Sequence, residues 1–150
     1  MIMSIGPDRL YIDKNDAQLY DELEKQDSMF VQSSNHDKFL FAMSVGFITG
    51  AKVSPTSRIG YFLTKDMGPD DEAMIDAVAI YSDDKSVLVL EDKKKVFNIA
   101  EAYAHAGIKL LSNKASTHMI DGSFYKQIEK ELYTLINDDT VGGNDKDTTS

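Results

Sequence analysis

The segment Val87–Lys93, with the sequence VLVLEDK, comes nearest to a catalytic pattern in this chain. An apolar strand that ends in Glu-x-Lys forms the second half of a signature of metal-dependent nucleases. In that arrangement Glu91 and an upstream acid such as Asp66 would hold Mg²⁺, and Lys93 would position the attacking water. Glu-x-Lys is common by chance, however, and such a nuclease needs a central sheet of several strands. The sequence favours the alternative, a turn that leads into a helix with Glu91 and Asp92 near its positive end.

The other acids and histidines are not spaced as metal ligands. The run Asp70-Asp71-Glu72 is typical of a solvated helix start, where acids complement the helix dipole. The three histidines, His36, His105 and His118, are far apart, and we expect each to be structural or at the surface. The chain has no cysteine, which excludes disulfides, thiol catalysis and thiolate zinc sites. It also has no phosphate loop, dinucleotide fingerprint or nucleophile elbow, so we expect no enzyme activity, metal or cofactor.

Basic residues offer a second kind of chemistry, which is contact with phosphates or with an acidic partner. The chain has one basic run, Lys93-Lys94-Lys95, and Lys52 and Arg58 could lie beside it. The alternative is a solvated helix start. A formal net charge of −9 argues against broad non-specific DNA binding, which needs a basic face.

The residues named above must be positioned by helices, because helical spacing of apolar residues is the main pattern in this chain. Apolar residues recur at helical spacing in five segments, at about 16–26, 36–49, 69–82, 92–112 and 123–136. The segment 36–49 is apolar almost all round, which predicts either a central helix or a helix with one face in a dimer. The pair Gly46 and Gly50 indicates close packing followed by a helix stop.

The helix boundaries have recognisable signals. Ser34 or Asn35 can cap the second helix, and Pro69 stands at a natural first helical position. Three small residues of the segment 92–112 would allow another helix to approach closely; these are Ala100, Ala104 and Gly107.

Extended structure is expected in few places. Arg9–Ile12 reads as a short extended lead-in, and Ile59–Leu63 as a strand or an extended connection, whereas 86–90 is ambiguous between helix and strand. The predicted fold is all-α, a compact bundle of about five helices, with either a short hairpin or an extended segment near 58–63. We expect a single helical domain over 1–137 and a disordered acidic tail over 138–150. Neither a signal peptide nor a membrane-spanning segment is evident, which indicates a cytoplasmic protein.

Two stretches carry a resemblance to a known family. The first is Lys38–Val53, and the second runs from Asp71–Ile80 through Val87–Leu90 to Phe97–Leu111. In that order and spacing they resemble the small dnd system-associated proteins, which are encoded beside DNA-phosphorothioation genes. The most distinctive element is Glu-x-Tyr-x-x-x-Gly, at residues 101, 103 and 107.

The resemblance covers about residues 9–113 and assigns no active-site residue. It implies a place in DNA modification by sulfur and in the defence against foreign DNA linked to it. The resulting expectation is a non-enzymatic accessory protein that binds a larger protein component of a restriction or antiviral system. The alternatives are a DNA-binding or regulatory module that uses Lys52, Arg58 and Lys93–Lys95, and the nuclease with Glu91 and Lys93. Homo-oligomer formation remains open.

Overall fold

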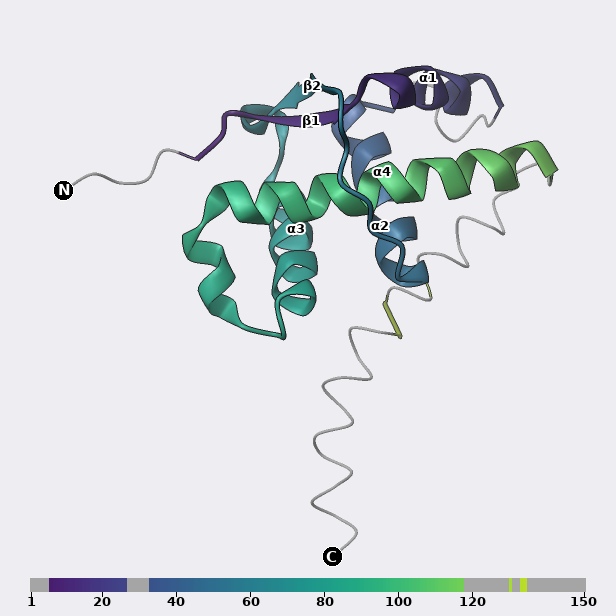
Figure 1. Ribbon diagram of the computed structural model, residues 1–150. Helices are drawn as coiled ribbons and strands as arrows, with labels where there is room; N and C mark the ends of the chain where they lie inside the picture. The colour runs from purple at the N-terminus through teal and green to yellow at the C-terminus, as the bar shows by residue number, and fades with distance from the viewer. Residues whose placement is uncertain (1–5, 27–32, 118–129, 131–132, 135–150) are drawn as a thin grey trace, which may run out of the picture.

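A computed structural model describes residues 6–26, 33–117, 130 and 133–134 (Figure 1). In chain order the elements are β1 (Arg9–Asp13), the 3-10 helix η1 (Lys14–Asp16), α1 (Ala17–Gln26), α2 (Asn35–Thr49), β2 (Arg58–Leu63), the 3-10 helix η3 (Thr64–Asp66), α3 (Pro69–Ser82), the 3-10 helix η4 (Val87–Glu91) and α4 (Lys93–Thr117). Most of the described chain is helical, as the sequence predicts. The expected helix over 123–136 and the expected tail over 138–150 lie almost wholly outside the described residues.

The crossing of α2 and α4 is the centre of the fold. In Figure 1, α4 runs across the molecule with α2 behind it, β1, β2 and α1 on one side, and α3 on the other. A Cβ atom added at Gly107 would lie 1.8 Å from the carbonyl oxygen of Ala42, and one added at Gly46 would lie 2.1 Å from that of Tyr103. The two backbones therefore meet directly, which confirms that the small residues of α4 allow close packing.

The boundaries of α2 and α3 follow from local signals. Ser34 Oγ accepts a hydrogen bond of 3.2 Å from the Asp37 N–H group at the start of α2. Gly50 ends α2 with a φ of 72°, a left-handed conformation that glycine adopts without a steric penalty. Pro69 opens α3, and Asp71 Oδ2 accepts from the Gly68 N–H group at 3.0 Å. These expected start and stop signals are confirmed.

The described part of the chain combines four α helices with a two-stranded sheet, so it is mainly helical as expected but is not clearly a bundle of five helices. Strands β1 and β2 pair antiparallel, from Arg9 opposite Leu63 to Asp13 opposite Arg58, with a register shift between Leu10 and Tyr11. The segment near 58–63 is thus a strand, but its partner is the extended lead-in at the start of the chain rather than a neighbouring hairpin arm. Residues 87–90 of the ambiguous segment 86–90 fall in the 3-10 helix η4, and Ser86 is its N-cap.

A single apolar core joins the sheet, the four α helices and η4. Its largest fully buried apolar side chains are Leu10, Tyr20, Leu23, Phe39, Met43, Val45, Ile75, Val96, Ile108 and Leu111. Phe39 of α2 contacts Phe62 of β2 edge to face, with ring centroids 5.3 Å apart, so the sheet is anchored to the central helix pair. Among the helices of the described part, none is long and apolar enough to cross a bilayer.

Candidate functional site

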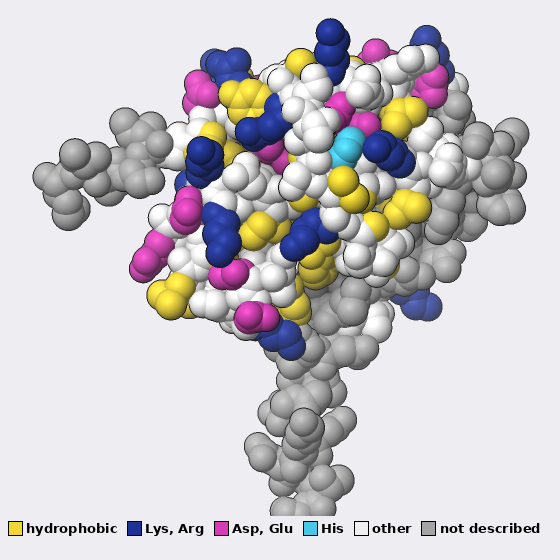
Figure 2. Space-filling view, in the orientation of Figure 1, with side chains coloured by type: hydrophobic (Ala, Val, Ile, Leu, Met, Phe, Trp, Pro, Cys, Tyr) yellow, Lys and Arg dark blue, Asp and Glu magenta, His cyan; other side chains and the backbone are white. Residues whose placement is uncertain are grey.

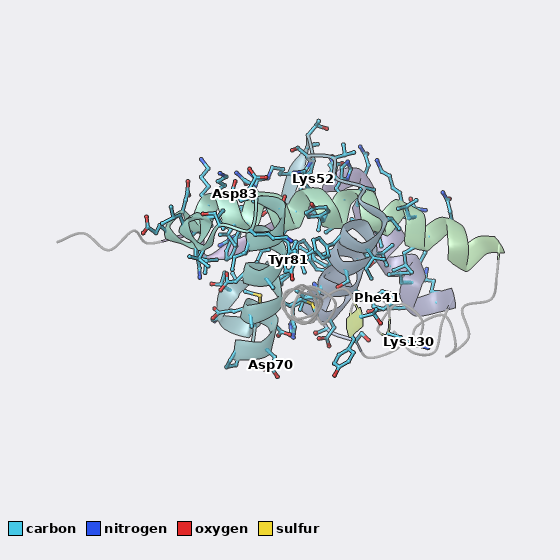
Figure 3. The ribbon with its side chains drawn as sticks, turned by 90° about the horizontal axis from the view of Figure 1, so that it is seen from below. Phe41, Lys52, Asp70, Tyr81, Asp83 and Lys130 are labelled. Carbon is cyan, nitrogen blue, oxygen red and sulfur yellow. The ribbon has the colours of Figure 1, made fainter. Side chains whose placement is uncertain are left out.

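Two of the basic residues singled out in the sequence meet at the carboxyl end of α3. Lys52 Nζ lies 3.2 Å from Ser82 Oγ, and Lys95 Nζ forms an ion pair of 3.1 Å with Asp83 Oδ1. Lys52 also lies over the ring of Tyr103, with Nζ 5.6 Å from its centroid. Figure 3 shows Lys52 and Asp83 along the same side of the molecule. These lysines already have partners within the protein.

Arg58 is built into a different part of the fold. Its guanidinium pairs with Glu101 of α4, with Nε 3.1 Å from Oε1, and stacks on the Tyr11 ring at 4.6 Å. Glu101 is only 2% exposed, and its other oxygen accepts a hydrogen bond of 3.3 Å from the Tyr11 N–H group. Burial raises the pKa of Glu101, while the Arg58 guanidinium opposes that rise. Arg58 therefore ties the sheet to α4.

The run Lys93–Lys95 opens α4. Lys93 lies over the ring of Phe97 at 5.9 Å, and Lys94 and Lys95 are exposed. Asp92 Oδ1 accepts a hydrogen bond of 3.1 Å from the Lys95 N–H group, as expected for an acid at the positive end of a helix. On the face of the molecule that Figure 2 shows, lysine and arginine side chains are spread out and interleaved with acids, rather than gathered into one basic patch.

The geometry at η4 does not provide the strand that a nuclease site would need. Val87–Glu91 is a 3-10 helix, so Glu91 does not end a strand, and the described part of the chain has a sheet of only two strands. Asp66 lies in η3 after β2. Over the described residues, no group of three or more His, Asp or Glu side chains is arranged to hold a metal ion. The acids Asp70, Asp71 and Glu72 fall in the first turn of α3, as expected.

The histidines occupy unrelated places. His36 is in the first turn of α2, with Nε2 3.1 Å from Ser34 Oγ and 3.7 Å from Asp71 Oδ2. His105 is 8% exposed, and its Nδ1 lies 2.5 Å from Oδ2 of the buried Asp16. Burial raises the pKa of Asp16, and the His105 contact opposes that rise. His118 lies outside the described residues.

Asp13 is a second buried acid, close to the Asp16–His105 pair. Asp13 accepts hydrogen bonds from the backbone N–H groups of Asn15 at 2.9 Å, Thr56 at 3.0 Å and Ser57 at 3.3 Å. These bonds, that from Asn15 foremost, lower the pKa of Asp13 to about 2. Asp13, Asp16, Glu101 and His105 together fasten β1 and η1 to the loop before β2 and to α4. We interpret this cluster as structural, and local sequence patterns give no sign of it because its members come from distant segments of the chain.

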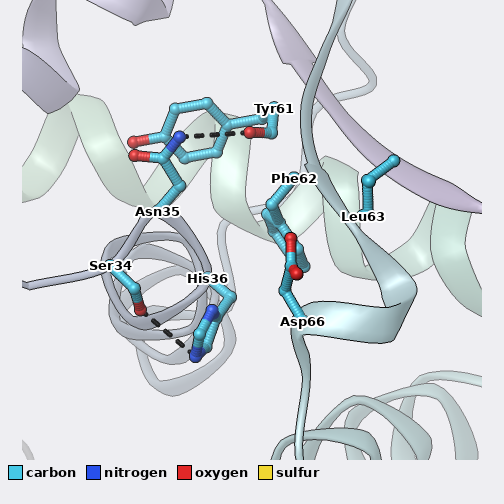
Figure 4. A pocket seen from close by; sticks show the side chains of 7 residues that line it. All are labelled: Ser34, Asn35, His36, Tyr61, Phe62, Leu63 and Asp66. Carbon is cyan, nitrogen blue, oxygen red and sulfur yellow. Dashed lines mark hydrogen bonds between the residues drawn. The ribbon is translucent and has the colours of Figure 1, made fainter.

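In the described part of the chain, two hollows that are open to solvent lie beside β2. The larger, of about 550 Å³, lies between β2 and the start of α2 and is lined by Ser34, Asn35, His36, Tyr61, Phe62, Leu63 and Asp66 (Figure 4). The smaller, of about 160 Å³, is lined by Arg9, Gly60, Tyr61, Phe62 and Leu63. The sequence pointed to neither, because their walls come from segments that are distant along the chain.

An apolar turn stands out on the surface. In η4, Val87 is 65% exposed, Leu88 68% and Leu90 37%, whereas Val89 between them is only 3% exposed. Val89 therefore anchors the turn in the core while its three apolar neighbours face solvent. We call Val87, Leu88 and Leu90 the apolar turn. Adjacent exposed apolar side chains of this kind often mark an interaction surface.

Comparisons with models of protein families, with curated proteins and with solved structures find no match to this chain.

Proposed function

We propose that this chain is a non-enzymatic, cytoplasmic accessory protein that binds a larger protein component of a DNA-phosphorothioation-linked restriction or antiviral defence system. The family resemblance suggests the system, and the apolar turn is the observation that supports action through protein contact. Three apolar side chains in one five-residue turn are exposed, and their burial against a partner would be favourable at about 25 cal/mol per Å².

The state of the basic residues also favours protein contact over DNA contact. Arg58 is paired with Glu101, and Lys95 with Asp83, so a phosphate would have to compete with an existing partner at each. The formal net charge of −9 adds long-range repulsion toward a polyanion.

A DNA-binding or regulatory role is the second candidate. It is favoured by one observation, which is that the consecutive residues Lys94 and Lys95 are both exposed at the start of α4. It predicts retention on duplex DNA that weakens steeply with salt and is abolished when Lys93, Lys94 and Lys95 are changed to Glu. Retention that this triple variant leaves unchanged would count against it.

The test of the leading proposal is capture of the system's proteins by the tagged chain. Val87→Ser combined with Leu88→Ser removes the two most exposed apolar groups of the turn while Val89 keeps its anchor. Val53→Ser is a matched control, since Val53 is 56% exposed and lies in the loop before β2. We expect the double variant to lose the captured proteins and the control to keep them. If both variants still capture the system's proteins, the apolar turn is not the contact surface.

A further inference from the structure

The two-stranded sheet has one edge that is covered and one that faces a hollow. At the covered edge, the Tyr11 N–H group of β1 donates to Glu101 Oε2 of α4 at 3.3 Å, so β1 lies between β2 and α4. The outer edge of β2 faces the first turn of α2 (Figure 4). There Asn35 Nδ2 donates to the Tyr61 carbonyl oxygen at 3.1 Å, so an added strand would replace this exposed side-chain bond at Tyr61 and pair with the backbone groups of Leu63 beyond it.

The register determines which backbone groups point outward. Just beyond the paired strands, the Thr64 N–H group donates to the Asp8 carbonyl oxygen at 2.9 Å. Asp8 and Thr64 therefore form a hydrogen-bonded pair, in which the backbone groups of Thr64 point toward the first strand. Leu63, opposite Arg9, is the next residue along, and hydrogen-bonded and non-bonded pairs alternate in an antiparallel ladder. The N–H and C=O groups of Leu63 therefore point away from β1, toward the outer edge.

The two hollows lie where the side chains of an additional strand would need room. Tyr61, Phe62 and Leu63 line both the hollow of about 550 Å³ and that of about 160 Å³. Successive side chains of a strand point to opposite faces of a sheet, so a strand beside β2 needs a recess on each side. Backbone bonds to an edge with pockets for alternate side chains are the features of peptide recognition by strand addition.

Charge differs between the two recesses. The Arg9 side chain lines the smaller one and lies over Gly60, where an added Cβ atom would be 3.2 Å from Arg9 Cδ. Its partner Asp8 is 75% exposed, and such surface pairs are weak. Asp66 lines the larger recess. An acidic side chain is therefore favoured on the Arg9 side, and a basic one on the Asp66 side.

We propose that the outer edge of β2 binds an extended peptide from a partner protein, which adds as a third strand with an acidic residue toward Arg9 and a basic residue toward Asp66. This site is distinct from the apolar turn of η4. It gives the protein a second, sequence-selective contact beyond the proposed function.

The probe is a phage-displayed library of random twelve-residue peptides, selected on the full chain, with the recovered sequences synthesised and their affinities measured. Leu63→Pro removes the outward N–H group, and the φ of −88° at Leu63 is near the range of proline. Leu63→Ala is the matched control, because it shortens the same side chain and keeps the N–H group. Each lost hydrogen bond contributes about 1 kcal/mol, so we expect Leu63→Pro to bind the selected peptide about fivefold more weakly than Leu63→Ala.

N-methylation of the peptide supplies a test that does not depend on any variant folding. Methyl groups on alternate residues, those whose N–H groups face β2, should abolish binding, whereas methyl groups on the intervening residues should not. A library that yields no binder, or equal sensitivity at every peptide position, overturns strand addition. Wild-type dimers that Leu63→Pro dissociates in light scattering would also overturn it, since the occupant would then be a second copy of the chain.

The two proposals fail separately. If the wild-type chain binds the peptide, Leu63→Pro loses it and the wild-type chain captures none of the system's proteins, the β2 site stands and the proposed function fails. If no peptide binds, yet the variant carrying Val87→Ser and Leu88→Ser loses captured proteins, the β2 site fails and the proposed function stands.

Discussion

Gly107→Ala is the substitution for which the close crossing of α2 and α4 reverses the effect expected from helix propensity alone. In the interior of a helix, alanine is favoured over glycine by about 1 kcal/mol, so this change would ordinarily stabilise α4. At Gly107, however, the new Cβ atom would lie 1.8 Å from the Ala42 carbonyl oxygen and 2.7 Å from the Gly46 nitrogen. Both neighbours are backbone atoms of α2, and no side-chain rotation can relieve the contact.

The size of the effect follows from the shift that α2 must make. Carbon and oxygen atoms need about 3.3 Å, so the helices must separate by roughly 1.5 Å at the crossing. A gap of about 0.5–1 Å already forfeits a quarter to a half of the dispersion energy of each contact across it. We therefore expect Gly107→Ala to lower the free energy of unfolding by about 3 kcal/mol or more, net of the gain in helix propensity.

Urea unfolding followed by circular dichroism measures this loss. Gly68→Ala is the control, because no atom lies within 4 Å of a Cβ added there and its φ of −88° suits alanine. We expect the control to change stability by less than about 1 kcal/mol. An unchanged or raised stability of Gly107→Ala would refute the close crossing of α2 and α4.

Three further predictions concern the buried polar groups and a strained turn. Asp13→Ala should lower the free energy of unfolding by about 2–3 kcal/mol in urea unfolding at neutral pH, since it leaves three backbone N–H groups without their acceptor. The pKa of Asp13 is lowered to about 2. The ionised carboxylate therefore adds stability above its ordinary pKa, and this stability is lost as the pH falls from about 4 to 2. Over that pH range the difference in free energy of unfolding between wild type and Asp13→Ala should vanish. Glu101→Ala should lower the free energy of unfolding by about 3 kcal/mol, because it removes the acceptor of Arg58 and of the Tyr11 N–H group. Glu101→Gln keeps an acceptor and should lower it by only about 1 kcal/mol. Equal losses in the two variants would contradict this reading. Lys85→Gly should raise the melting temperature relative to Lys85→Ala, because the φ of 62° at this position penalises any residue with a Cβ atom.

The parts of the fold that the sequence predicts are those with local signals. Ser34, Gly50 and Pro69 each carry a conformational preference that their own position expresses, so α2 and α3 begin and end close to the expected residues. The spacing of small residues in α4 likewise predicts a close helix partner, and Gly107 meets α2 as expected.

The parts that it does not predict depend on contacts between distant segments. The pairing of β1 with β2 joins residues about fifty positions apart, and neither strand is long enough to indicate its partner. The carboxylates of Asp13, Asp16 and Glu101 look like surface acids in the sequence, because their burial is decided by partners elsewhere in the chain. The hollows beside β2 are unpredictable for the same reason.

The residues that carry the family resemblance have structural roles. Glu101 holds Arg58 and the edge of β1, Tyr103 packs on Phe47 with ring centroids 5.6 Å apart, and Gly107 admits α2. The residues proposed to act on partners lie elsewhere, in η4 and along β2.

The most direct test of the central claim is quantitative capture of the phosphorothioation-linked system's proteins by the tagged chain from cells that express both. We predict that wild type and Val53→Ser recover the same component in equal amounts, and that the variant carrying Val87→Ser and Leu88→Ser recovers about tenfold less or none. Failure of the wild-type chain to recover any component of that system would contradict the account.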